Sequence, residues 1–176
     1  IGNTYTGTAN GKVVFTLELD PDTGVYSFTQ FKQIDHANSS NPNDSVSLVF
    51  GVTATDADGD TAKTTITVNV FDDGPVAVDD GAYVTGNNLT VTGNVLGNDD
   101  AGTDGLGSVT KVTFAGVDYA VPASGDLTVV GQYGVLKISA NGAYSYTSSN
   151  TALGNDSFTY TMVDFDGDPS QAKVSI

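Results

Sequence analysis

Apolar and polar residues alternate along several short segments of the chain, which is the pattern of strands with one buried face. Apolar residues take every second position in segments 46–54, 66–70, 158–162 and 172–176, and most residues between them are Ser, Thr, Gly or Asn. No segment of helical length shows a 3.6-residue period. The pattern therefore predicts an all-β protein. The expected core-facing residues are Val46, Leu48, Phe50, Val52, Ala54, Ile66, Val68, Val70, Phe158, Tyr160, Met162, Ala172, Val174 and Ile176.

Three short motifs occur twice in the same order, which indicates two copies of one repeat. They are Gly-x-Tyr-Ser-aromatic-Thr at residues 24–29 and 142–147, Asn-Asp-Ser at 43–45 and 155–157, and Asp-x-Asp-Gly-Asp at 56–60 and 164–168. Tight-turn sequences, Pro21-Asp22-Thr23-Gly24 and Asn141-Gly142, accompany the first motif. Short strands with turn signals at this spacing are typical of immunoglobulin-like β-sandwiches, so we expect tandem sandwich domains.

A short, stiff linker separates the two copies at Phe71-Asp72-Asp73-Gly74-Pro75, because Pro75 cannot donate to a strand ladder. We expect domains at residues 1–73 and 74–176. The second copy is long enough for a complete sandwich, whereas the first has no counterpart of the N-terminal strands. Residues 1–73 are therefore expected to be a truncated or split domain, with a naturally smaller sandwich as the alternative.

Acidic residues outnumber basic residues by 21 to 6. The formal net charge is −15, and the six basic residues include no Arg. Such a chain would be repelled by nucleic acid and by an anionic membrane surface. No apolar run reaches the roughly 18 residues of a membrane helix, and no leader-like segment opens the chain, so we expect a soluble piece without an N-terminal signal. The absence of Cys excludes disulfides and thiolate chemistry.

Loops alternate between the two poles of an antiparallel sandwich, which predicts where the acidic segments meet. We take residues 76–84 as the first strand of the second domain and residues 89–96 as its next strand. The acidic loop 98–104, including Asp104, then lies at the pole where that domain begins. The turn at 164–168 precedes the last strand and falls at the same pole. We therefore expect three acidic segments to converge at the junction of the two domains.

Clustered carboxylates repel one another, and a hard cation such as Ca²⁺ reverses the sign of that energy. The Asp-x-Asp-Gly-Asp loops are not EF-hands, because Gly59 and Gly167 stand at loop position 4 and the bidentate Glu is absent. A plain Asp-Gly turn in an acidic protein is the alternative for either loop alone. The candidate calcium ligands are Asp72, Asp73, Asp79, Asp80, Asp99, Asp100, Asp164, Asp166 and Asp168, with Asp56, Asp58 and Asp60 at the corresponding pole of the first copy.

The chain resembles the tandem repeats of large type I-secreted bacterial RTX (biofilm-associated) adhesins. The resemblance rests on residues 52–60 and 70–75, and on the cadherin-like signature at 94–99, 155–160 and 164–168. It implies an extracellular, calcium-rigidified extender on the bacterial surface, which projects a distal ligand-binding domain and supports adhesion and biofilm formation. Its implied partners are neighbouring repeats of the same adhesin, with any glycan or peptide bound through another domain, and we expect a monomer.

Two other classes of function compete with the extender interpretation. We expect no enzyme, because the single histidine, His36, lies in a polar loop without a nucleophile motif and is expected to be solvated. A calcium-dependent sugar- or peptide-binding module, or a split scaffold domain carrying one, is the stronger alternative. Its candidate contacts are Tyr83, Tyr119 and Tyr133, although the lack of Trp weakens a sugar-stacking platform. Four strand aromatics, Tyr26, Phe28, Tyr144 and Tyr146, are expected in the core.

Overall fold

The computed structural model describes residues 3–34, 36, 41, 43–103, 105–149 and 154–176. The described residues form strands and turns without a helix, which confirms the all-β prediction. None of them forms a helix of the length and apolarity needed to cross a membrane. The chain divides into two compact units: unit 1 holds the described residues up to Asp72, Asn41 apart, and unit 2 continues from Asp73.

Unit 1 consists of two small antiparallel sheets. Strands β1 (Thr4–Ala9), β2 (Lys12–Leu19) and β3 (Tyr26–Gln30) form one sheet in sequence order, and β4 (Ser45–Thr55) and β5 (Thr61–Phe71) form a long hairpin. Apolar residues on β4 alternate as predicted from Val46 to Val52, but Ala54 is exposed, since the hairpin extends beyond the small core. Among the described residues of this unit, Leu17 and Phe50 are the buried hydrophobic ones, and the Tyr5 and Phe15 rings contact Phe50 edge to face.

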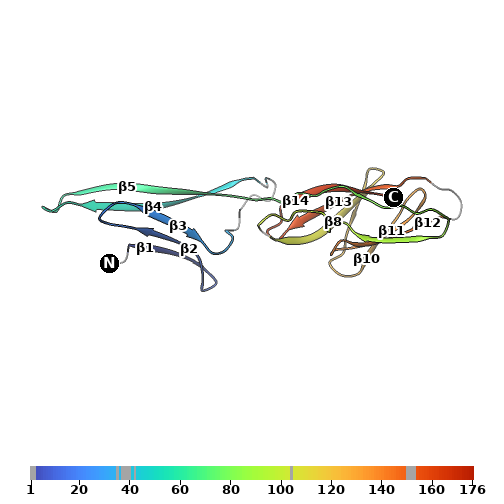
Figure 1. Ribbon diagram of the computed structural model, residues 1–176, viewed down its shortest axis with the longest axis horizontal. Helices are drawn as coiled ribbons and strands as arrows, with labels where there is room; N and C mark the ends of the chain where they lie inside the picture. The colour runs from blue at the N-terminus through green and yellow to red at the C-terminus, as the bar shows by residue number, and fades with distance from the viewer. Residues whose placement is uncertain (1–2, 35, 37–40, 42, 104, 150–153) are drawn as a thin grey trace. The chain divides into compact units, whose positions relative to one another are not determined.

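Unit 2 is a β-sandwich of two antiparallel layers (Figure 1). One layer has the order β10 (Asp126–Val130), β11 (Gly134–Ser139), β12 (Ala143–Ser148) and β7 (Thr90–Asn94). The other has the order β6 (Asp80–Gly81), β14 (Pro169–Ser175), β13 (Ser157–Asp164), β8 (Leu106–Phe114) and β9 (Val117–Ala120). Most neighbouring strands are antiparallel, and only β6 runs parallel to its partner β14.

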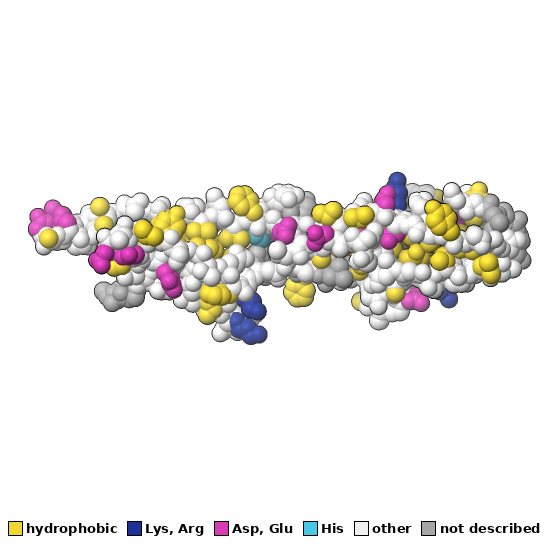
Figure 2. Space-filling model, viewed as in Figure 1, with side chains coloured by type: hydrophobic (Ala, Val, Ile, Leu, Met, Phe, Trp, Pro, Cys, Tyr) yellow, Lys and Arg dark blue, Asp and Glu magenta, His cyan; other side chains and the backbone are white. Residues whose placement is uncertain are grey.

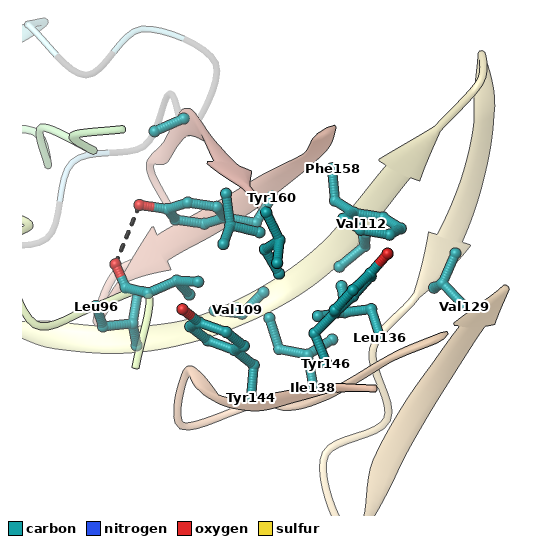
Figure 3. Close-up of a cluster of buried hydrophobic side chains, with 14 of the residues drawn as sticks. Leu96, Val109, Val112, Val129, Leu136, Ile138, Tyr144, Tyr146, Phe158 and Tyr160 are labelled. Carbon is teal, nitrogen blue, oxygen red and sulfur yellow. Dashed lines mark hydrogen bonds between the residues drawn. The ribbon is translucent and has the colours of Figure 1, made fainter. Parts of the chain in front are cut away.

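The core of unit 2 lies between these layers and is fully closed. Figure 3 shows Tyr144 and Tyr146 pointing toward Phe158 and Tyr160, which come from the opposite layer. The six core-facing residues predicted on β13 and at the C-terminal end are all buried, as period-2 burial on a sandwich strand requires. They are Phe158, Tyr160, Met162, Ala172, Val174 and Ile176.

Two sequence predictions were wrong, one about a strand and one about the burial of an aromatic side chain. The segment expected as a first strand at residues 76–84 contains only the two-residue β6 and an isolated bridge between Val76 and Asp100, because side chains take some of its backbone donors. Among the aromatics expected in the core, Tyr144 and Tyr146 are buried and Phe28 is half-buried, but Tyr26 is 51% exposed. The exposure of Tyr26 reflects the smaller number of strands around it in unit 1.

Candidate metal centre

The two Asp-x-Asp-Gly-Asp loops adopt one backbone conformation. In unit 2 the Oδ1 of Asp164 accepts hydrogen bonds from the amides of Gly167 and Asp168, at 3.0 and 2.7 Å. In unit 1 the Oδ1 of Asp56 accepts from the amides of residues 59 and 60 in the same way. The glycines have φ of 103° and 108°, a region that L side chains rarely adopt, which explains why Gly stands at this position in both copies.

The same loop has opposite environments in the two units. Asp56, Asp58 and Asp60 are exposed, and Figure 2 shows carboxylates gathered at the tip of hairpin β4–β5. In unit 2, by contrast, Asp164 is 3% exposed and Asp168 is 1% exposed. In unit 1, the carboxylate oxygens of Asp56, Asp58 and Asp60 lie within 4.8 Å of one another. In unit 2, an oxygen of Asp166 lies within 4.8 Å of an oxygen of Asp168.

The acidic segments of unit 2 converge on its N-terminal pole, where its first residues enter the fold. The backbone of Val76 pairs with that of Asp100, at 2.7 and 2.9 Å. One residue later, the Ala77 amide donates to the Ser170 hydroxyl, just past the Asp164–Asp168 turn. These contacts bring the first residues, the 98–100 loop and the last turn together within unit 2. The expectation that they also meet unit 1 stays a prediction.

A second group of polar side chains lies beside this pole, around the hydroxyl of Tyr160. That hydroxyl donates to the Asp99 carboxylate at 2.9 Å, and one oxygen of Asp99 also accepts from the Val78 amide. Burial raises the pKa of Asp80 to about 6, a hydrogen bond to Tyr160 opposes the rise, and the charges of Asp99 and Asp79 add to it. Burial and the hydrogen bond to Asp99 also raise the pKa of Tyr160.

Several carboxylate oxygens, at this pole and in the group around Tyr160, are buried without a hydrogen-bond donor among the described residues. They are Oδ2 of Asp80, Oδ2 of Asp164 and Oδ1 of Asp166. Burial and the neighbouring Asp166 raise the pKa of Asp164 above its ordinary value, against the backbone bonds that lower it. Buried carboxylate oxygens require a proton, a donor or a cation. A hard cation with oxygen ligands therefore fits the residues present.

The other predicted ligands of unit 2 have different roles. Asp79 accepts from the amide of Lys173 on β14, and Asp100 accepts from the amide of Gly102 within its own loop. Asp73 accepts from the Thr103 amide at 3.1 Å. These three carboxylates tie down backbone at the N-terminal pole, and Asp104 lies outside the described residues.

His36 is not a solvated loop residue, which corrects the sequence interpretation. Its imidazole is 4% exposed and its Nδ1 contacts the Asp44 carboxylate. A ligand atom of Asp72 lies within 4.8 Å of both, and the Asp72 amide donates to the Asp44 carbonyl. Asp72 thus closes the base of hairpin β4–β5 together with Asp44. Sequence reasoning missed this group because the contact arises only from the folded arrangement of these segments.

The sequence located Asp156 in a repeated motif but did not reveal its role. Its carboxylate is 2% exposed and accepts from the amides of Gln132 and Tyr133, each at 2.9 Å, and from the Tyr146 hydroxyl at 2.7 Å. Burial and this hydrogen bond raise the pKa of Tyr146. Asp156 is therefore a structural acceptor rather than a metal ligand.

The tyrosines proposed as ligand contacts do not share a wide cleft. Tyr83 is 91% exposed, whereas Tyr119 packs partly against the core. Tyr83 and Tyr133 line a hollow of about 70 Å³ together with Tyr146 and Gly154. This volume accommodates only a few water molecules.

Comparison with protein families assigns both parts of the chain. Residues 72–176 match the bacterial cadherin-like domain, and residues 1–69 match a domain of unknown function (DUF5801). None of the curated proteins matches the chain significantly. The cadherin-like match covers more than half of the chain and coincides with the sandwich that carries the buried carboxylates. The chain therefore belongs to the bacterial cadherin-like domain family.

Proposed function

We propose that this chain is a calcium-rigidified extender of a large, type I-secreted bacterial surface adhesin of the RTX, biofilm-associated kind. Bacterial cadherin-like domains are adhesion and structural modules, which supports an adhesin-like repeat region. In this role the chain projects a distal ligand-binding domain from the cell surface. Its mechanical task is to remain stiff.

The observation that carries the proposal is the set of buried carboxylate oxygens without a hydrogen-bond donor, at the N-terminal pole of unit 2 and in the group around Tyr160 beside it. Ionised carboxylates in this position repel one another and lose hydration, so the folded unit is destabilised without a cation. Asp80, Asp164, Asp166 and Asp168 would hold the ion or ions, and calcium would supply the missing positive charge to their oxygens.

This chain's own residues do the rest of the positioning. The Gly167 and Asp168 amides fix one oxygen of Asp164, which leaves its other oxygen available for a cation. The Val78 amide and the Tyr160 hydroxyl orient Asp99, and the hydroxyl lies within hydrogen-bond distance of both of its carboxylate oxygens. Because these groups come from the start, the middle and the end of unit 2, a shared cation would connect segments that otherwise repel. Loss of local motion at this pole is the expected physical basis of stiffening.

Calcium titration of thermal unfolding tests the proposal. After EDTA treatment, calcium at 10 to 100 times its Kd should stabilise by about 1.4 to 2.7 kcal/mol per site. For a unit of this size that corresponds to a rise in Tm of roughly 6 to 20 °C. Mg²⁺ at equal concentration should give a smaller rise, because it demands tighter octahedral geometry. Small-angle scattering should show a narrower range of particle dimensions with calcium.

Two matched variants separate a metal site from a general charge effect. Asp166→Asn keeps the size of the side chain, removes one charge, and should raise the Tm without calcium while reducing the calcium-induced rise. Asp126→Asn makes the same chemical change at an exposed position of β10 and should alter neither value. If calcium leaves the Tm and the scattering of the parent protein unchanged, the extender mechanism is wrong and a glycan or peptide screen becomes the next experiment.

A further inference from the structure

One group of side chains in unit 1 combines nitrogen and oxygen ligands. It lies at the base of hairpin β4–β5 and consists of His36, Asp44 and Asp72. One ligand atom of each residue lies within 4.8 Å of those of the other two. Because His36 is the single histidine of the chain, an imidazole nitrogen can join carboxylate oxygens only here. This mixture separates the group from the oxygen-only clusters at the tip of the same hairpin and in unit 2.

The backbone of the hairpin holds the two carboxylates close together. Ser45 pairs with Phe71 at the end of the β4–β5 ladder, and one residue further the Asp72 amide donates to the Asp44 carbonyl at 3.0 Å. Asp44 and Asp72 therefore stand directly opposite each other on adjacent segments. Like charges in this arrangement destabilise a strand pair. The fold thus creates a fixed demand for positive charge at the base of the hairpin.

His36 meets this pair from the segment that precedes the hairpin, and its side chain is almost completely enclosed. The imidazole is 4% exposed and its Nδ1 contacts the Asp44 carboxylate. The side chain of Asp44 is 18% exposed, so the group keeps a contact with solvent on that side. A buried nitrogen with a partly exposed oxygen beside it provides both a ligand and a path by which an ion enters.

The charge of the group favours a divalent cation over a proton as the third component. Two ionised carboxylates carry two negative charges. A protonated imidazole would leave one of these charges uncompensated, whereas a divalent cation bound to the neutral imidazole would compensate both. An uncompensated charge is costly here, because partly buried charges are screened much less than exposed ones.

We propose that His36, Asp44 and Asp72 bind a divalent transition-metal ion of the zinc class. Imidazole nitrogen is a preferred ligand of Zn²⁺, Cu²⁺ and Ni²⁺, whereas Ca²⁺ and Mg²⁺ prefer oxygen ligands. Ligand atoms of one tetrahedral zinc ion lie about 3.4 Å apart, so the observed spacing requires only small side-chain movements. The site assigns Asp72, a calcium ligand in the sequence prediction, to a different metal, and it is independent of the extender proposal.

The single histidine makes the test direct, because every imidazole signal of the chain belongs to His36. The full chain is stripped of metals with EDTA, transferred to buffer with excess Ca²⁺ to fill oxygen-only sites, and titrated with Zn²⁺. NMR follows the ring nitrogens, and isothermal titration calorimetry measures the stoichiometry. We expect the Nδ1 signal to shift and to saturate at one zinc ion per chain. Mg²⁺ at equal concentration should leave the signal unchanged.

Matched variants identify the ligands. His36→Gln and Asp44→Asn each remove one ligand and should weaken zinc binding at least tenfold, since even the loss of an outer-shell partner typically costs about 10- to 100-fold. Asp22→Asn makes the same chemical change as Asp44→Asn at an exposed position of unit 1 and should leave the zinc affinity unchanged.

Three results would overturn the proposal: no zinc binding by the parent chain in excess calcium, zinc binding that leaves the His36 signals unchanged, or equal zinc affinity in His36→Gln and Asp22→Asn. In the first case the group is an ion pair only, and in the others zinc binds elsewhere. The imidazole signals are measured on the parent chain, so the test remains decisive if a variant does not fold. Constant calcium separates this outcome from that of the extender test.

Discussion

Truncation of Asp156 to Ala tests how far one buried carboxylate holds unit 2 together. The change removes the acceptor of three hydrogen bonds, from the amides of Gln132 and Tyr133 and from the Tyr146 hydroxyl. The exposed Gln132 can bind water instead, but the hydroxyl of Tyr146, a residue only 2% exposed, cannot easily do so.

The expected loss in the free energy of unfolding follows from these three hydrogen bonds. Hydrogen bonds to a charged acceptor contribute about 1.5 to 3 kcal/mol each, and a stranded buried donor carries its full desolvation cost. With one of the three donors rehydrated, the two remaining bonds, each taken at the lower end of this range, give a cost of about 3 kcal/mol for Asp156→Ala. That corresponds to a fall in the Tm of unit 2 of roughly 12 to 24 °C. Asp156→Asn should cost less, because the amide retains one acceptor oxygen.

Equilibrium unfolding in urea, followed by circular dichroism at constant calcium, measures the effect. Unit 1 provides an internal control, since its transition should not move. Tyr146→Phe removes a single donor and should cost about 1 kcal/mol. A loss below 1 kcal/mol for Asp156→Ala, or a loss no larger than that of Tyr146→Phe, would refute the reasoning.

Three further predictions concern other parts of the chain. Without calcium, the raised pKa of Asp80 means that the folded state holds its proton more tightly than the unfolded state, so the free energy of unfolding should fall as the pH rises from about 4 to 6. Solvent screening limits this fall in the free energy of unfolding to roughly 1 kcal/mol, and Asp80→Asn should remove the pH dependence. The same pH dependence in the variant would contradict the assignment of this effect to Asp80. Gly107→Ala should cost at least about 2 kcal/mol in urea unfolding, because its Cβ would overlap carbonyl oxygens of the adjacent strand β13. His36→Ala should lower the Tm of unit 1 by leaving the Asp44 carboxylate half-buried without its partner, whereas the exposed Lys32→Ala should not; equal Tm values would argue against the pair.

Period-2 burial made β4, β5, β13 and β14 predictable from the sequence. Phe158, Tyr160 and Met162 read as one face of a strand because a sandwich buries one side of each strand and exposes the other. The internal repeat added the turns, since Gly59 and Gly167 mark the same positive-φ position in each copy. Local pattern and global burial agree in these segments, so sequence reasoning was sufficient.

The sequence did not reveal contacts made between distant segments. Residues 76–84 are expected to form the first strand of the second domain, yet the amide of Val78 donates to the Asp99 side chain instead of a ladder carbonyl. His36 lies in a polar segment, but a partner eight residues away removes it from solvent. Asp164 and Asp56 have the same motif and the same turn, and only the fold distinguishes the buried carboxylate from the exposed one.

This difference in burial determines where a cation can affect folding. A carboxylate that stays hydrated in the folded state gains little from calcium beyond what it gains in the unfolded chain, so binding at Asp56, Asp58 and Asp60 should be weakly linked to stability. A carboxylate whose oxygen has already lost water and found no donor, such as Asp164, has its desolvation cost offset only when a proton or a cation arrives. Under the proposed function, the buried copy of the loop would make the stability of unit 2 depend on calcium, and an extender with this dependence would be stiff at high calcium concentration and flexible at low calcium concentration.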